Sequence, residues 1–327
     1  MLRKQSRRKK QLARIDELLG DAKTVGIAGH VGPDGDCVGS CMGLYLYLKK
    51  NRPDIKAELY LESVKDVFHY IAGVGEVRFA VTEKKVCDCM VILDVSSPDR
   101  IGVAGDLFDA AKRTVCIDHH ITNPGFADEN VIEATASSAS EVLYGLLDPK
   151  KVDKDCAEAL YTGIVHDSGV FQYSNTSAKT LRTAAELIAK GIDFPSIIDH
   201  SFYEKTYAQN RILGKVLNGA QLYADGAVIV GVALPEDMKA YGVTKQDMDG
   251  IVSQLRLTKG VQAAIFLYPA EDGAFKVSLR ANGQMRVSDV AAAFGGGGHV
   301  KAAGCTMSGT PEEIIEKLLA ECKKQLD

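Results

Sequence analysis

The sequence predicts an α/β protein whose larger, N-terminal part is a doubly wound parallel sheet. Short apolar segments alternate with helical segments, which is the pattern of βαβ units. These segments, such as 24–28 and 90–93, lack alternating polar positions, as expected for strands buried on both faces. The alternation breaks at 191–195, and a new series of strands and helices follows. The sequence therefore predicts a second, smaller α/β domain after a connector.

Composition sets the outer limits of the interpretation. The chain has 327 residues, about twice the roughly 150 residues of a typical domain. Hydrophobic residues make up 46%, charged residues 25%, and the net charge is −4, so a disordered chain and a strongly basic nucleic-acid coat are excluded. Apolar runs fall short of the roughly 20 residues of a membrane span, and the basic N-terminus lacks the apolar stretch of a signal peptide. We expect a soluble, cytoplasmic protein that does not associate with membranes.

The elements of the N-terminal part follow in order. Residues 2–20 predict an amphipathic helix with Leu12, Ile15, Leu18 and Leu19 on one face, preceded by basic residues. Strands are predicted at 24–28, 57–61, 90–93 and 114–117, and helices at 37–49, 138–147, 155–165 and 178–189. Because ligands bind beyond the carboxyl ends of such strands, the residues that follow them are the candidate site.

The remaining chain predicts a helical connector and its own sheet. The helix of the connector is expected at 196–217, the strands at 227–233, 262–268, 275–280 and 303–307, and two further helices at 247–257 and 311–325. We therefore expect a catalytic, metal-binding domain over 1–190, a connector over 191–217 and a substrate-binding domain over 218–327.

Clusters of acidic and histidine residues follow the predicted strands and one helix. They are GHVGPDGD at 29–36, LDVSS at 93–97, Asp118-His119-His120, and His166-Asp167. A single Asp at the end of a strand is usually a turn or cap residue. Several clusters at one edge of one sheet are harder to explain in that way, so we expect them to form one site.

These residues have the chemistry of a two-metal centre. Carboxylates that lie close together repel one another unless a cation lies between them. Two imidazoles and four carboxylates suit Mn²⁺, and suit Mg²⁺, Zn²⁺ or Co²⁺ less well. The set is His30, Asp34, Asp36, Asp94, His119 and Asp167. It is large enough for two ions that share one carboxylate, an arrangement typical of phosphoester hydrolysis.

The same motifs resemble those of the DHH phosphoesterase family, and they occur in the order of that family. The second domain resembles the DHHA1 domain through Val277-Ser278-Leu279-Arg280 and the GGGGH segment at 295–299. The resemblance implies an N-terminal doubly wound DHH domain joined by the connector to a smaller α/β DHHA1 domain. The two-domain layout is most similar to the nanoRNase/pAp-phosphatase branch, which degrades very short RNA and dephosphorylates 3′-phosphoadenosine 5′-phosphate (pAp).

The resemblance also implies roles for individual residues. One metal site would use His30, Asp34 and Asp94, and the other would use Asp36, Asp94, His119 and Asp167, with Asp94 bridging. For catalysis, Asp118 would orient a histidine and His120 would face the scissile phosphate. His166 is expected to be a packed residue or to support a metal ligand from behind. Substrate binding would use Arg280, Gly296, Gly297, Gly298 and His299. Ala281 departs from the family, which often has serine there.

The implied activity is a Mn²⁺-dependent phosphodiesterase and phosphatase, with Mg²⁺ or Co²⁺ as alternative ions. Its substrates would be short RNA oligonucleotides, pAp or dinucleotides, which it would hydrolyse to mononucleotides, and a homodimer is a candidate assembly. Two alternatives stay open. One is a phosphodiesterase for pApA or cyclic dinucleotides, and the other is a non-catalytic sensor of nucleotides or RNA.

Overall fold

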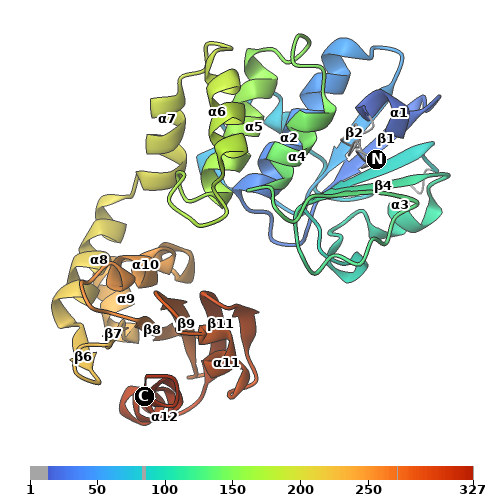
Figure 1. The fold of residues 1–327 in the computed structure, drawn as a ribbon. Helices are drawn as coiled ribbons and strands as arrows, with labels where there is room; N and C mark the ends of the chain where they lie inside the picture. Colours follow the sequence, from blue (N-terminus) through green and yellow to red (C-terminus); the bar gives the residue numbers. More distant parts are fainter. Residues whose placement is uncertain (1–13, 83–85, 271, 327) are drawn as a thin grey trace, which may run out of the picture. The chain divides into compact units, whose positions relative to one another are not determined.

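The protein consists of two compact units, one up to Glu204 (unit 1) and one from Lys205 onward (unit 2). We analysed a computed structural model, which describes residues 14–82, 86–270 and 272–326 (Figure 1). Leu12 and most of the basic run predicted for the N-terminal helix lie outside the described residues; α1 comprises Ile15–Leu19. The functional domain limits given above stay a prediction.

Unit 1 contains a five-stranded parallel sheet, which confirms the predicted fold class. Its strands are β1 (Thr24–Ala28), β2 (Lys56–Tyr60), β3 (Cys89–Leu93), β4 (Thr114–Asp118) and β5 (Glu129–Ile132), in the order β2-β1-β3-β4-β5. The sequence analysis missed β5, a partly exposed edge strand that begins with polar residues. The direction of winding reverses between β1 and β3, and ligands of doubly wound sheets bind at such a switch point.

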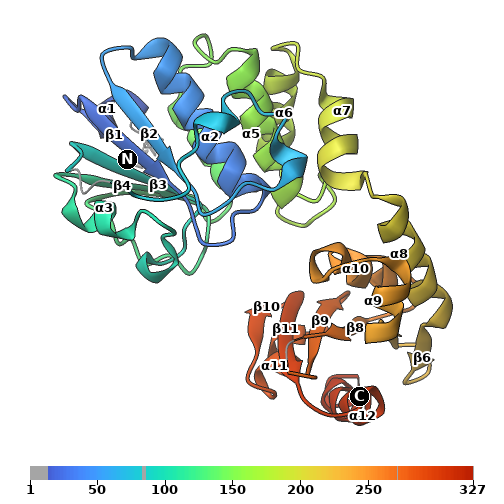
Figure 2. The same cartoon turned by 180° about the vertical axis from the view of Figure 1, so that it is seen from behind.

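Helices cover both faces of this sheet (Figures 1 and 2). On one face lie α2 (Gly35–Asn51), α4 (Ala139–Leu146), α5 (Lys154–Asp167) and α6 (Ala178–Ile188), and on the other lies α3 (Gly105–Ala110). The strands alternate accordingly: Val91 packs in the core that contains α2, α4 and α5, whereas Ile92 packs with Leu107 and Phe108 of α3. The sheet is therefore doubly wound, as predicted.

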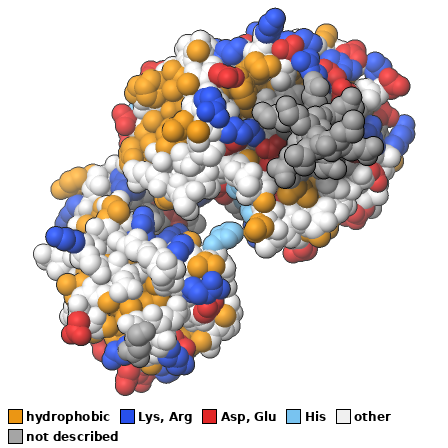
Figure 3. All heavy atoms as spheres, viewed as in Figure 1, with side chains coloured by type: hydrophobic (Ala, Val, Ile, Leu, Met, Phe, Trp, Pro, Cys, Tyr) orange, Lys and Arg blue, Asp and Glu red, His pale blue; other side chains and the backbone are white. Residues whose placement is uncertain are grey.

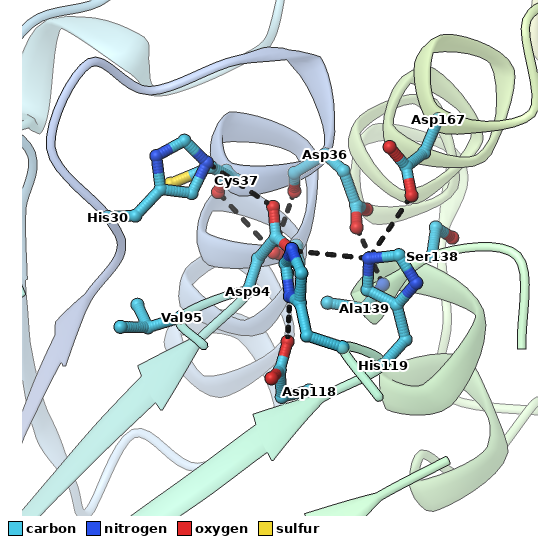
Figure 4. A network of polar contacts seen from close by, with 12 residues as sticks. His30, Asp36, Cys37, Asp94, Val95, Asp118, His119, Ser138, Ala139 and Asp167 are labelled. Carbon is cyan, nitrogen blue, oxygen red and sulfur yellow. Dashed lines mark hydrogen bonds and ion pairs between the residues drawn. The ribbon is translucent and has the colours of Figure 1, made fainter. Parts of the chain in front are cut away.

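Helices α2 and α5 pack unusually closely. A Cβ atom on Gly39 of α2 would lie 2.5 Å from the carbonyl oxygen of Ala159 and 2.9 Å from Cα of Gly163 in α5. Such distances are shorter than van der Waals contact, so only glycine allows the two backbones to approach this far. The close packing brings the start of α2 and the end of α5 to the edge of the sheet where β1 and β3 end (Figure 4).

The predicted connector helix is interrupted. Helix α7 (Phe194–Ile198) continues into a π-helical turn, Asp199–Tyr203 (the π-turn), and Glu204 is extended. Helix α8 (Tyr207–Gly219) then begins with Thr206 as its N-cap, which forms a capping box with Gln209. Because Thr206 and Gln209 satisfy backbone groups at a new helix start, the segment forms separate helices rather than one.

Unit 2 contains a mixed six-stranded sheet in the order β10-β11-β9-β8-β7-β6. The strands are β6 (Gln221–Tyr223), β7 (Val228–Val232), β8 (Ala263–Pro269), β9 (Phe275–Ala281), β10 (Gly297–His299) and β11 (Ala302–Met307), and the helices are α8, α9 (Pro235–Tyr241), α10 (Ile251–Arg256), α11 (Val287–Ala292) and α12 (Pro311–Lys323). One core contains residues of α11 and α12, and the other contains residues of α8 and α10.

Several short elements of unit 2 escaped the sequence analysis, namely β6, β10, α9 and α11. The helix predicted at 247–257 is divided into a 3₁₀ turn, Lys245–Met248, and α10, because Gly250 between them has a φ of 84°. Elements this short carry too few residues for a clear hydrophobic period.

The described surface shows exposed apolar side chains on α6 and α7. Leu181 and Phe194 are 52% and 38% exposed, and hydrophobic side chains gather over this part of unit 1 in Figure 3. No helix among the described residues is long and apolar enough to cross a membrane.

Candidate metal centre and active site

The acidic and histidine side chains singled out in the N-terminal part meet at the carboxyl edge of the unit 1 sheet (Figure 4). His30 follows β1, Asp94 follows β3, and His119 and His120 follow β4. Asp34 and Asp36 lie at the start of α2. Asp167 is the last residue of α5, rather than a residue beyond the helix as the sequence suggested.

Asp94 lies at the centre of this group. Its Oδ2 is 3.5 Å from Nε2 of His30, and its Oδ1 is 3.4 Å from Nε2 of His119. The residue is only 3% exposed, and among the described residues no donor forms a hydrogen bond with Oδ1. Its φ of 58° is left-handed, a conformation that Asp tolerates better than most side chains. A buried carboxylate oxygen without a donor is the feature expected of a cation ligand.

The described residues form three groups of potential metal ligands, of which one (Asp94, Asp118, His119 and His120) overlaps the other two at Asp94 and His119. The other two groups are the first and second donor sets. In the first donor set (His30, Asp34 and Asp94), one ligand atom of each residue lies within 4.8 Å of the others. The second donor set (Asp36, His119 and Asp167) meets the same limit, and Nε2 of His119 is 3.1 Å from Oδ2 of Asp167. Both sets combine imidazole nitrogen with carboxylate oxygen, a mixture that suits Mn²⁺ and other divalent transition metals. The residues therefore fit two divalent ions with Asp94 between them.

Helix starts hold two of the carboxylates in place. Asp34 is the N-cap of α2, and its Oδ1 accepts hydrogen bonds from the backbone N–H groups of Asp36 and Cys37, both at 3.1 Å. Asp36 is 1% exposed and accepts from the backbone N–H groups of Ala139 at 2.6 Å and Ser140 at 3.0 Å, at the start of α4. Backbone N–H groups at helix starts favour negative charge, so they orient both carboxylates without neutralising them. The sequence analysis missed the contribution of α4.

His120 is held by a different carboxylate. Its Nδ1 lies 2.8 Å from Oδ1 of Asp118, which is fully buried. The other oxygen of Asp118 accepts a hydrogen bond of 2.6 Å from the side-chain amide of Asn123, which also donates to the carbonyl of Val95. Carboxylates in this position fix the tautomer and orientation of an imidazole. Asn123 also escaped the sequence analysis, although it lies only a few residues beyond the DHH motif.

The pKa values of the group reflect its crowded negative charge. Burial, followed by repulsion from Asp94, raises the pKa of Asp36, and burial with repulsion from Asp36 raises that of Asp167. Burial alone would lower the pKa of His119, but Asp94 and the nearby carboxylates more than offset it and raise the pKa to about 10. The same balance, through Asp34 and Asp94, raises the pKa of His30 to about 12. The carboxylates thus favour positive charge on whatever lies between them.

Burial opposes ionisation of Asp94 as well, but His119 and His30 outweigh it and hold the pKa of Asp94 below its usual range. This carboxylate is therefore ionised at neutral pH despite being buried. As a member of the first donor set that also lies close to His119 of the second, Asp94 links the two sets.

His166 belongs to neither donor set. Its Nε2 lies 3.0 Å from Oγ of Ser201, and its ring packs edge to face against Phe68 and Phe202. Burial lowers the pKa of His166 to about 4, so the ring is neutral at physiological pH. The structure places it beside the candidate metal ligands rather than among them.

The residues predicted to bind substrate lie on the sheet of unit 2. Arg280 of β9 is in register with Ala302 of β11, which is in register with His299 of β10. Paired residues on neighbouring strands share a face, so the Arg280 and His299 side chains lie on the same face of this sheet. Arg280 is half-buried, and its guanidinium donates a hydrogen bond of 3.0 Å to the carbonyl of Leu279.

The glycines beside His299 form part of an edge strand. Gly297 and Gly298 belong to β10, and a Cβ atom on Gly298 would lie 2.5 Å from the carbonyl oxygen of Ala302. A Cβ atom on Gly296 would lie 2.2 Å from the carbonyl oxygen of Gly304, whereas one on Gly297 would meet open space. Gly296 and Gly298 are thus needed for packing on β11, a reason the sequence did not reveal. Gly297 leaves the backbone open to a ligand.

Two family models match separate parts of the chain. The sequence model of the DHH family, N-terminal domain, matches residues 24–164, and that of the DHHA1 domain matches residues 225–327. Among solved structures, an exopolyphosphatase-related protein from Bacteroides fragilis superimposes with a TM-score of 0.85 and 26% identity, over 93% of each chain.

Curated relatives align along nearly the whole chain. The bifunctional oligoribonuclease and PAP phosphatase NrnA of Thermus thermophilus is 32% identical over 92% of this chain and 89% of its own. NrnA of Bacillus subtilis is 27% identical over 92% of this chain and 95% of its own. The cyclic-di-AMP phosphodiesterase PdeA of Listeria monocytogenes is 26% identical over 95% of this chain but only 48% of its own. With these matches and both domain models, the chain belongs to the DHH family and carries a C-terminal DHHA1 domain.

Proposed function

We propose that the protein is a Mn²⁺-dependent phosphoesterase that hydrolyses short oligoribonucleotides and pAp to mononucleotides. The observation that supports this most is Asp94, a buried carboxylate between two donor sets with one oxygen that accepts no hydrogen bond from the described residues. The substrate class comes from the relatives named bifunctional oligoribonuclease and PAP phosphatase, which align over nearly the whole chain.

His30, Asp34 and Asp94 would hold one ion, and Asp36, His119 and Asp167 would hold the other together with Asp94. A pair of divalent ions supplies a water nucleophile at neutral pH and neutralises charge on the phosphate oxygens. The protein contributes rigid ligands: Asp34 and Asp36 are fixed by backbone N–H groups, and Asp94 by the end of β3. Ligands held in this way lose little freedom when a metal binds.

His120 would act on the substrate itself. Its Nδ1 is paired with Asp118, which raises the pKa of the ring, so a protonated His120 would donate from Nδ1 to Asp118 and from Nε2 to a phosphate oxygen. The side chain is 27% exposed, which leaves room for such an approach. Asp118 and Asn123 would keep the ring in this orientation during the reaction.

Arg280, His299 and Gly296 to Gly298 would contribute to substrate binding. An arginine can form paired hydrogen bonds with phosphate oxygens, and a glycine strand admits a ligand close to its backbone. This arrangement in unit 2 would select short substrates, because metal-assisted hydrolysis by itself discriminates little between phosphoesters.

A substrate panel tests the proposed activity. The purified protein is incubated with Mn²⁺, Mg²⁺ or Co²⁺ and with pAp, pApA, 5-mer RNA or 20-mer RNA, and the products are resolved by chromatography. We expect turnover of pAp and of the 5-mer, a slower reaction with the 20-mer, and the highest rate with Mn²⁺. Equal rates on both RNA lengths would contradict the preference for short oligomers.

An Arg280→Ala variant tests the binding role. A lost charge-assisted contact costs about 1.5–3 kcal/mol, which corresponds to a rise in KM of about 10- to 150-fold. Lys276→Ala is the matched control, because Lys276 is exposed on the same strand and the same face. Cleavage of bis-p-nitrophenyl phosphate should be nearly unchanged in both variants. A proportional loss on both substrates would place Arg280 in catalysis or folding instead.

A second candidate function is hydrolysis of pApA or of cyclic dinucleotides. It is favoured by the alignment with the cyclic-di-AMP phosphodiesterase PdeA, which spans 95% of this chain. A specificity constant for cyclic di-AMP or pApA that exceeds that for pAp would favour this candidate. Binding of nucleotides without turnover of any substrate in the presence of Mn²⁺ would favour the sensor. A cytoplasmic location and a homodimer stay predictions.

A further inference from the structure

We propose that His166 is a positioning residue, whose ring fixes the two segments that carry Asp34, Asp36 and Asp167 by packing them against the π-turn. This inference rests on the proposed function, because it takes these carboxylates as metal ligands. It assigns a task to a histidine that lies outside both donor sets, and to the segment that ends unit 1.

The first contact is with the start of α2. Gly35 lies between Asp34 and Asp36, and a Cβ atom on it would be 2.2 Å from Cγ of His166. The imidazole is therefore packed directly on the backbone of this turn, and a larger residue at 35 would displace the ring or the turn. A shift of the ring would be transmitted to the carboxylates on both sides of Gly35.

The second contact is with the π-turn. The centroid of the His166 ring lies 5.4 Å from that of Phe202 in the π-turn, edge to face. Phe68, outside the π-turn, packs on the same ring edge to face at 5.0 Å. Oγ of Ser201 donates a hydrogen bond of 2.6 Å to the carbonyl of Ile197, so Nε2 of His166, at 3.0 Å from Oγ, is the donor between them. The π-turn thus places consecutive residues, Ser201 and Phe202, on one ring.

The π-turn is closed by a backbone hydrogen bond. The backbone N–H of Glu204 donates to the carbonyl of Asp199 at 2.7 Å, which closes the wide turn directly before the chain leaves unit 1. π-Helical turns are rare and occur frequently at functional sites. Here the wide turn brings Ser201 and Phe202 onto the His166 ring.

The end of α5 is also held by contacts that do not involve the His166 ring. Gly169, Val170 and Phe171 all have φ between 54° and 64°, a left-handed run that is unfavourable for a β-branched residue such as Val170. Oγ of Ser168 accepts from the backbone N–H of Phe171 at 3.0 Å, and the Asn175 side-chain amide donates to the carbonyl of Asp167 at 3.0 Å. These contacts hold the chain at and after Asp167, while the ring of the preceding residue, His166, holds the same end of α5 against Gly35 and the π-turn.

Metal affinity of three variants tests the inference. The variants are His166→Ala, Phe202→Leu and the matched control His200→Ala, which lies in the same π-turn but is 61% exposed. Binding of Mn²⁺ alone to the metal-free proteins is followed by electron paramagnetic resonance, together with kcat and KM for pAp. Loss of a group that supports metal ligands weakens metal affinity by about 10- to 100-fold.

We expect the Mn²⁺ dissociation constant to rise at least about tenfold in His166→Ala and by about three- to tenfold in Phe202→Leu. At saturating Mn²⁺ both variants should still bind two ions, kcat should fall and KM should stay within about twofold, because substrate contacts are unchanged. His200→Ala should match the parent protein. If His166→Ala does not fold, Phe202→Leu decides the question, since it removes only part of one ring contact.

Two results would overturn the inference. One is Mn²⁺ affinity within about twofold of the parent in Phe202→Leu, which would show that the π-turn does not act on the metal centre. The other is loss of one ion at saturation in His166→Ala, which would make His166 a ligand. A parent protein that neither binds Mn²⁺ nor hydrolyses any substrate would instead contradict the proposed function.

Discussion

At the scale of single residues, the charge on Asp94 is the decisive feature of the candidate centre. It is the carboxylate close to both His30 and His119, and it occupies a left-handed conformation that fixes its direction. Asn tolerates the same backbone conformation and has nearly the same shape. Asp94→Asn therefore removes the charge and preserves the local geometry.

We expect Asp94→Asn to lower kcat/KM for pAp by at least about 10³-fold, because both ions would lose a shared ligand. Bound Mn²⁺, measured by elemental analysis, should fall below two ions per chain. Circular dichroism of the metal-free variant is the control and should show the same helix and strand content as the metal-free parent. Activity within tenfold of the parent would show that Asp94 is not the bridging ligand.

At the scale of elements, the approach of α2 to α5 brings ligands from distant parts of the chain together. Asp36 belongs to α2 and Asp167 to α5, and Gly39 allows the close contact between these helices. The atoms that a Cβ on Gly39 would meet belong to the α5 backbone. Because a backbone cannot rotate away as a side chain can, the clash is relieved only if the two helices separate.

We expect Gly39→Ala to lower the free energy of unfolding by about 1–3 kcal/mol, the usual cost of overpacking, as measured by urea denaturation. Its matched control is Gly145→Ala in α4, where a Cβ atom would meet open space. That control should be neutral or stabilised by up to about 1 kcal/mol, because alanine favours the helix. Equal urea midpoints for Gly39→Ala and the parent would contradict the close packing of α2 on α5.

A second connection between elements joins the starts of β1 and β3. Oδ2 of Asp88 accepts hydrogen bonds from the backbone N–H and hydroxyl of Thr24, each at 3.0 Å, and Oδ1 pairs with Lys112 at 2.8 Å. The contact with Lys112, followed by the backbone N–H of Lys23, lowers the pKa of Asp88 below its usual range. The ionised form is therefore favoured in the folded protein.

Because the folded pKa lies below the unfolded value of about 3.9, the stabilisation by Asp88 is complete above that pH and is lost as the pH falls further. We expect Asp88→Asn to unfold at lower urea than the parent at pH 7. The difference should shrink progressively below about pH 4. A difference in urea midpoint that does not change between pH 7 and pH 3 would contradict a role for the charge.

At the scale of the whole molecule, each unit has its own hydrophobic cores and its own sheet. The candidate metal ligands all lie in unit 1, whereas Arg280 and His299 lie in unit 2. Metal binding should therefore stabilise one unit and leave the other unchanged.

We expect calorimetry of the full chain to show two unfolding transitions, only one of which responds to Mn²⁺. A ligand at about 100 times its dissociation constant stabilises by about 2.7 kcal/mol. For a domain of this size, that corresponds to an upward shift of roughly 5–10 °C. The same scan with Asp94→Asn is the control and should show a smaller shift. A single transition that moves as a whole would show that the units unfold together.

The sequence by itself determined most strands of the two sheets and most residues of the candidate site. Continuous apolar runs such as 90–93 can be satisfied only by burial on both faces, and polar residues such as Asp94 and His119 directly follow them. Local patterns of this kind specify the strand, its end and the direction of the residues beyond it. Weaker patterns failed: β5 is polar at its start, and β10 consists largely of glycine.

Only the tertiary structure decided which distant residues meet. Asp36 is placed beside Asp167 by the contact between α2 and α5, and it is oriented by N–H groups at the start of α4. The ring of His166 meets Gly35 and Phe202, and the glycines at 296 and 298 meet β11. These contacts join segments far apart in sequence, and they depend on how closely two backbones pack. Hydrophobic periodicity records that a residue is buried, but it does not record which neighbour buries it.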